Sequence, residues 1–116
     1  MIRKRKHRKT KHHFGTTPDS AVIDLMTRYH SDLTKSRRIY FYLYFPNERN
    51  AFVAKCELAA NGFSVEMDRS ASDSQWLCLA SKEMIADDRE LTKLRRYFTK
   101  LAESLHGNYD GWETEM

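Results

Sequence analysis

The stretch RRIYFYLYFPNE, residues 37–48, limits the fold of this chain more than any other segment. Two kinds of side chain alternate along it. One set consists of Ile39, Phe41, Leu43 and Phe45, and the other of Tyr40, Tyr42 and Tyr44. Successive residues of a strand point to opposite faces of a sheet, so this period of two predicts a strand with a core on one side and tyrosines on the other. Pro46 should end the strand because proline has no N–H to donate.

Two helices are expected on either side of this strand. The first should begin at its cap, Thr17, and run to about residue 34. Its apolar stripe is Val22, Leu25, Met26, Tyr29 and Leu33. The second should follow the cap Asn47 and end before Gly62. The apolar residues of this second helix are expected to pack closely on a sheet; they are Ala51, Phe52, Cys56, Leu58 and Ala59.

The rest of the chain predicts a hairpin, a helix and a final strand. Residues 63–81 contain two alternating apolar runs around a polar turn, which indicates a hairpin. Asp87 and Glu90 have the spacing of a capping box, and Gly107 should stop the helix that they begin. The segment NYDGWE, residues 108–113, is too short for a helix and suits a strand.

This order predicts an α+β fold, the ferredoxin-like βαββαβ arrangement with an extra N-terminal helix. Residues 39–45 and 76–80 should form the central strands. Leu77 and Leu79 are expected beneath the helices, which would place Trp76 and Cys78 on the tyrosine face.

Two hypotheses account for the tyrosine face. The favoured one is that the first helix lays its apolar stripe on this face, since both surfaces are then buried. The alternative is that RNA bases stack on the strand aromatics, as they do on RNA-recognition domains. The sequence motif of those domains is missing at the third strand, where QWLCLAS stands.

The net charge of +4 divides unevenly along the chain. Residues 14–116 hold 13 of the 20 basic residues and all 16 acidic residues, a net charge of −3. We therefore expect a disordered basic arm over 1–16 and a single domain over 17–116. The arm could hold RNA phosphates together with Tyr40 and Tyr42. Its basic residues are Arg3, Lys4, Arg5, Lys6, Arg8, Lys9 and Lys11.

Several classes of function are disfavoured. No nucleophile, metal cluster or phosphate-binding loop accompanies Asp110 and Glu113, so we expect no enzyme, no metal and no cofactor. No run of about 20 apolar residues predicts a membrane span. Cys56 and Cys78 indicate buried thiols in a reducing, cytoplasmic compartment. The basic residues of the last helix are interpreted as a solvated surface, with nucleic-acid binding as the less favoured alternative.

The ordered segments YFPNE, NGFSVE, QWLCLAS and NYDGWE resemble the family of regulators of ribonuclease E activity, type B. The resemblance runs from about Asp32 to Glu113. It implies a ferredoxin-like bacterial protein of the cytoplasm that binds ribonuclease E, or another nuclease, and inhibits RNA cleavage without catalysis of its own. The candidate partner-binding residues that it implies are Tyr44, Pro46, Tyr109, Asp110, Gly111, Trp112 and Glu113.

Overall fold

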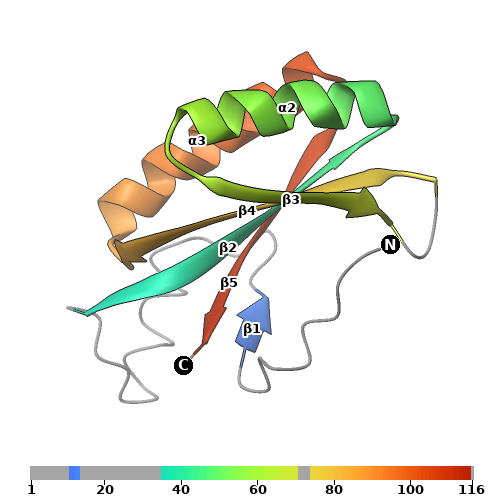
Figure 1. Cartoon of the computed structure of the whole chain (residues 1–116). Helices are drawn as coiled ribbons and strands as arrows, with labels where there is room; N and C mark the ends of the chain where they lie inside the picture. Colours follow the sequence, from blue (N-terminus) through green and yellow to red (C-terminus); the bar gives the residue numbers. More distant parts are fainter. Residues whose placement is uncertain (1–10, 14–34, 71–73, 116) are drawn as a thin grey trace.

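The computed structural model describes residues 11–13, 35–70 and 74–115. The predicted first helix and residues 1–10 and 14–16 of the arm lie outside these ranges. The described elements follow one another as strand β1, strand β2, helix α2, strands β3 and β4, helix α3 and strand β5 (Figure 1). Their bounds are Lys11–His13, Ser36–Phe45, Glu48–Ala60, Ser64–Arg69, Trp76–Ile85, Asp88–Ser104 and Asn108–Glu115.

The strands form one antiparallel sheet with the order β1-β5-β2-β4-β3. Helices α2 and α3 lie on the same face of this sheet (Figure 1). From β2 to β5 the chain follows the predicted βαββαβ order, and the two central strands of those four are β2 and β4, as expected. The sequence prediction of an α+β fold is confirmed for the part of the chain that the structure describes.

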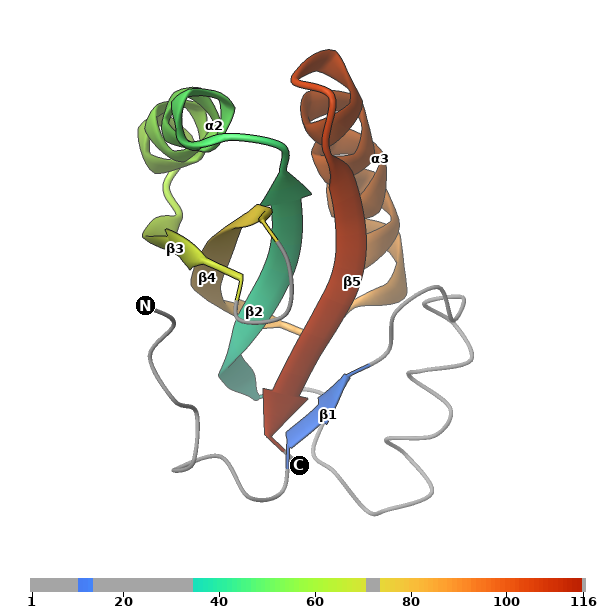
Figure 2. The same ribbon diagram turned by 90° about the vertical axis from the view of Figure 1, so that its right-hand side faces the viewer.

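Strand β1 adds a fifth member to the sheet beside β5 (Figure 2). Lys11 lies opposite Glu115, and His13 lies opposite Glu113. These residues belong to the segment that the sequence predicted to be disordered, and the structure places Lys11–His13 in a strand. A run of basic residues carries no apolar signal, but its backbone can still extend a sheet at an open edge.

The helix ends follow the capping signals closely. The side chain of Asn47 accepts a hydrogen bond from the backbone N–H of Asn50 at 2.8 Å, and Asp87 accepts one from Glu90 at 3.0 Å. Gly62 ends α2 with a φ of 92°. At the end of α3 the left-handed residue is His106, with a φ of 62°, whereas the sequence placed the helix stop at Gly107.

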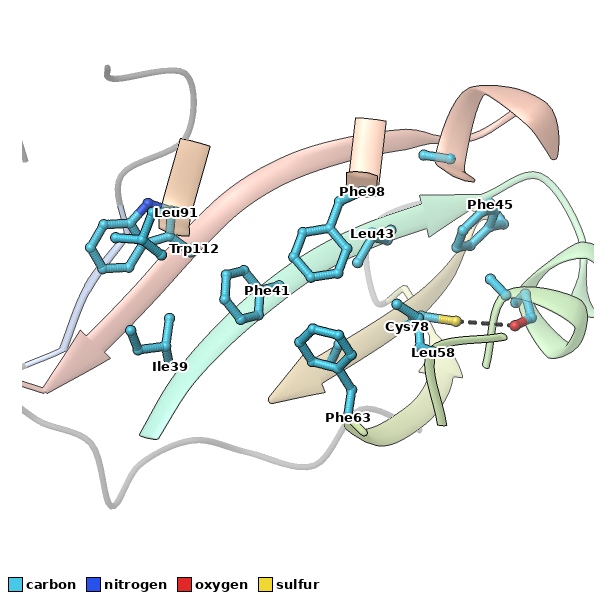
Figure 3. Close-up of a cluster of buried hydrophobic side chains, with 14 of the residues drawn as sticks. Ile39, Phe41, Leu43, Phe45, Leu58, Phe63, Cys78, Leu91, Phe98 and Trp112 are labelled. Carbon is cyan, nitrogen blue, oxygen red and sulfur yellow. Dashed lines mark hydrogen bonds between the residues drawn. The ribbon is translucent and has the colours of Figure 1, made fainter. Parts of the chain in front are cut away.

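The core between the helices and the sheet is built on the apolar side of β2 (Figure 3). The rings of Phe41 and Phe63 both pack on Phe98 of α3, with centroid distances of 4.7 Å and 5.3 Å. Cys78 points into the same core and its thiol donates a hydrogen bond to the Ala51 carbonyl oxygen at 3.1 Å (Figure 3). Burial of this aromatic cluster fixes α3 on β2.

The faces of β4 are opposite to those predicted. Tyr42 lies across from Leu79, and Tyr44 lies across from Leu77. Directly opposed residues of an antiparallel pair share a face, so both leucines lie on the tyrosine side. Cys78 and Ala80 lie under the helices instead, where Ala51 and Ala54 of α2 are fully buried. Small residues on both surfaces let the helix approach the strand closely, and the sequence argument had placed the larger leucines there.

Candidate protein-interaction surfaces

The tyrosine side of the sheet is a second apolar cluster. Tyr42, Leu77 and Leu79 are its buried members, and Tyr40 and Tyr44 pack against them partly exposed. Neither α2 nor α3 lies on this side (Figure 1). Tyr42 is only 2% exposed, so its ring presents no face on which a base could stack. This burial disfavours the RNA-stacking role of Tyr42, which stays a prediction, while Tyr40 keeps part of its surface in solvent.

A buried hydrogen bond joins the tyrosine cluster to β5. The hydroxyl of Tyr42 donates to the carboxylate of Glu113, which is 6% exposed. The neighbouring Thr114, 1% exposed, donates its hydroxyl to the Arg38 carbonyl oxygen at 2.9 Å. A buried carboxylate needs such a donor because it has lost most of its hydration. Glu113, a candidate partner contact in the sequence, is held inside the fold by β2.

The NYDGWE segment supports the core more than it faces outward. Trp112 is 3% exposed within the main core, and Tyr109 packs on Phe98 with ring centroids 5.3 Å apart. Between them, Gly111 has a φ of 96°, where the pairing of β5 with β2 shifts register. Glycine adopts this backbone conformation without steric cost. Partner contact by Trp112 stays a prediction, and its burial in the core disfavours it.

The YFPNE segment lies where β2 passes into α2. Pro46 is exposed, Tyr44 is partly exposed and Asn47 caps the helix. Asn50 donates its side-chain amide to the Leu105 carbonyl oxygen at 2.8 Å, which ties the start of α2 to the end of α3. The hydroxyl of Tyr97 in α3 accepts a hydrogen bond from the Asn61 side-chain amide at 3.2 Å and donates one to the Glu57 carboxylate at 3.4 Å. Hydrogen bonds therefore join the two helices near both ends of α2, and they fix the orientation of the helix surfaces.

The outward surface of α2 is apolar and exposed. Phe52 and Val53 are 54% and 47% exposed, and the thiol residue Cys56 is also exposed. The α2 apolar face, as we define it, consists of Phe52, Val53, Cys56, Ala59 and Ala60, all of them exposed. The expectation that Phe52, Cys56 and Ala59 pack on the sheet is wrong, because Ala51, Ala54 and Leu58 occupy that side. A helix with apolar residues on all sides normally has both surfaces covered.

Two titratable side chains among the described residues have raised pKa values. Burial raises the pKa of the Cys78 thiol to about 12, and nearby Lys55 lowers it only partly, so the sulfur is protonated at neutral pH. Burial and the charge of Glu57 likewise raise the pKa of Tyr97. Within 11–13, 35–70 and 74–115, no three His, Cys, Asp or Glu side chains gather as metal ligands. No helix in these ranges is long and apolar enough to cross a membrane.

The basic arm is described only at its end. Lys11 lies in β1, and the other six arm residues that the sequence singled out lie outside the described ranges. Sequence reasoning missed the α2 apolar face. The signal was present in the sequence, since the apolar residues of this helix spread around its circumference instead of forming one stripe.

Comparison with known proteins identifies the family. No curated protein sequence matches the chain at a significant level. A family model described as regulator of ribonuclease activity B matches residues 16–114. The match covers the sheet from β2 to β5 with both helices. It agrees with the resemblance of the YFPNE and NYDGWE segments. The chain belongs to the family of regulators of ribonuclease activity B.

Proposed function

We propose that the chain is a non-catalytic regulator that binds a ribonuclease through the α2 apolar face and slows RNA cleavage. The observation that carries this proposal is the exposure of Phe52 and Val53 on a helix whose other side is already packed on the sheet. The family supplies the class of partner, because it regulates ribonuclease activity. The resemblance in sequence favours ribonuclease E.

The exposed apolar surface is large enough to contribute to binding. A phenylalanine side chain buries about 150–250 Å² when fully covered, and Phe52 is 54% exposed. Covering the rest removes about 100 Å² from water, which corresponds to about 2.5 kcal/mol at 25 cal/mol per Å². Such a residue at the centre of an interface has the properties of a hot spot. Its neighbours Val53 and Cys56 would exclude water around it.

The segments shared with the family have a positioning role in this proposal. Asn47 caps the start of α2, and Asn50 ties it to Leu105. Gly107 then passes close to the Tyr44 carbonyl oxygen, where a side chain would not fit. YFPNE and the residues before NYDGWE would therefore hold the α2 apolar face in a fixed orientation. A rigid surface loses less entropy when it binds.

The experiment compares two variants in an RNA-cleavage assay with purified ribonuclease E. Phe52→Gln removes the proposed anchor and keeps a residue that favours helix. Ile85→Thr is the matched control, because Ile85 is also 48% exposed but lies at the end of β4. We expect Phe52→Gln to weaken inhibition about ten- to fiftyfold, as the loss of up to about 2.5 kcal/mol predicts, and Ile85→Thr to inhibit like the original chain.

Direct binding, measured by calorimetry with the same nuclease, should follow the same order. Equal inhibition by Phe52→Gln and the original chain would remove the α2 apolar face from the proposal. If the folded original chain neither inhibited nor bound the nuclease, the proposed function itself would be contradicted.

A further inference from the structure

Four basic residues lie in one row on the outward surface of α3. They are Arg89, Lys93, Arg96 and Lys100, and all four are exposed. Their spacings of four, three and four residues keep them on one side of a helix. With a rise of 1.5 Å per residue, the row is about 16 Å long. We call it the α3 basic row.

The acidic residues of α3 do not interrupt this row. Asp88 and Glu90 lie in the first turn of the helix, where carboxylates are favoured by the backbone N–H groups of the helix start. Glu103 follows Lys100 and so lies beyond the last member of the row. Between Glu90 and Glu103 the helix therefore carries basic residues and no acidic one. In the sequence these charges looked mixed, since Asp88 and Glu90 flank Arg89, and Glu103 follows Lys100.

A hollow lies beside the second half of the row. Its volume is about 370 Å³, and the residues that line it include Arg95, Arg96, Thr99 and Lys100. The stems of long basic side chains provide apolar walls, while their charged ends stay at the rim. A space of this size is in the range of small-ligand sites. It can take a flat base or a sugar next to the cations.

We propose that the α3 basic row and the adjacent hollow bind the backbone of single-stranded RNA. A linear set of cations fits a polymer that carries one negative charge per nucleotide, so several neighbouring phosphates can lie along the row. Arginine forms paired hydrogen bonds with phosphate oxygens, and its plane stacks on a base. This activity does not depend on the proposed binding of a nuclease, and no nuclease is needed to measure it.

The test is the binding of a fluorescent uridine oligonucleotide to the full chain, followed by anisotropy over a range of salt concentrations. The variant Arg96→Gln/Lys100→Gln removes two cations next to the hollow. The control variant Arg49→Gln/Arg69→Gln removes two exposed cations from α2 and β3. Glutamine favours a helix about as well as the basic residues do. The variants therefore differ in where the charge is lost.

We expect the α3 variant to bind about tenfold more weakly at low salt and the control to change by less than twofold. The plot of log affinity against log salt should become less steep by about 1.4 in the α3 variant, since each lost contact with a single strand contributes about 0.7 to the steepness. Equal weakening of the two variants would overturn the proposal, because binding would then follow only the total charge. No weakening in the α3 variant would overturn it as well.

Amide chemical shifts give a second readout on the original chain. Addition of the oligonucleotide should shift the amide signals of residues 89–100. Shifts confined to residues 1–13 would show that only the arm binds RNA and would contradict the proposal. Polyglutamate represents an acidic protein partner and is added as a competitor of the oligonucleotide. If it displaces the oligonucleotide at an equal concentration of charge, the α3 basic row is not an RNA site.

Discussion

The buried contact between Tyr42 and Glu113 gives the sharpest stability prediction. Tyr42→Phe removes the hydroxyl that donates to the carboxylate and leaves the size of the ring unchanged. Because Glu113 is 6% exposed, water cannot fully replace the lost donor. Hydrogen bonds to charged groups contribute about 1.5–3 kcal/mol, and a buried partner left without its donor costs a similar amount. We expect the free energy of unfolding to fall by about 2 kcal/mol.

Thermal and urea unfolding, followed by circular dichroism, measure this loss. For a domain of this size 1 kcal/mol corresponds to about 4–8 °C in Tm, so Tm should fall by about 8–16 °C. Tyr97→Phe is the matched control, because Tyr97 also bonds to a carboxylate, Glu57, but at an exposed position. Exposed pairs contribute little, and the control should lose less than about 1 kcal/mol.

An equal, small loss of stability in Tyr42→Phe and Tyr97→Phe would show that burial does not strengthen the contact between Tyr42 and Glu113. A double-mutant cycle adds Glu113→Gln. The two substitutions should not be additive, since each removes part of the same contact. Additive losses would show that Tyr42 and Glu113 stabilise the fold through separate interactions.

The Cys78 thiol has a higher pKa in the folded chain than in the unfolded chain, so its contribution to stability should be complete below pH 9 and decline between pH 9 and about pH 12. In urea titrations Cys78→Ala should lack this decline. Parallel pH profiles of the variant and the original chain would contradict the raised pKa. Gly107→Ala should destabilise the domain by about 1–3 kcal/mol, because the new Cβ would collide with the Tyr44 carbonyl oxygen. Unchanged thermal unfolding would show that this approach is not tight. If the chain contacts a basic segment of the nuclease, the basic arm repels that segment. Neutralising the seven basic residues of 1–13 should then strengthen inhibition, most at low salt, where screening is least. Weaker inhibition in the cleavage assay would give the arm the opposite role.

The order of the elements could be predicted from the sequence because its signals are local. The alternation in residues 37–45, the end at Pro46 and the caps Asn47 and Asp87 each depend on nearby backbone groups. These signals placed β2, α2 and α3 within a few residues of their observed bounds. The central position of β2 and β4 followed from their high apolar content.

The orientation of β4 could not be predicted in the same way. Trp76, Cys78 and Ala80 form one face, and Leu77 and Leu79 form the other, and both faces are apolar. The pattern therefore does not say which face the helices cover. The close packing of Ala51 and Ala54 decides it, because small residues are needed opposite a closely packed helix. Such complementarity depends on a contact between distant parts of the chain.

The interaction surfaces were missed for a related reason. Phe52 and Cys56 were assigned to the core because apolar residues are normally buried, but Ala51, Ala54 and Leu58 already fill the side that faces the sheet. The α3 basic row was overlooked because Asp88, Glu90 and Glu103 lie beside its two ends in the sequence. The candidate residues of NYDGWE, by contrast, were prominent in the sequence because the fold needs them in β5.

The central claim is that a ribonuclease covers the α2 apolar face, and the alkylation rate of Cys56 tests it most directly. Cys56 is an exposed thiol on this face, whereas Cys78 is buried and protonated, so a mild alkylating reagent should modify Cys56 alone in the folded chain. A saturating amount of ribonuclease E should slow the modification at least tenfold, and an unrelated RNA-binding protein of similar charge should not. An unchanged rate, under conditions where the nuclease is shown to be bound, would contradict the account.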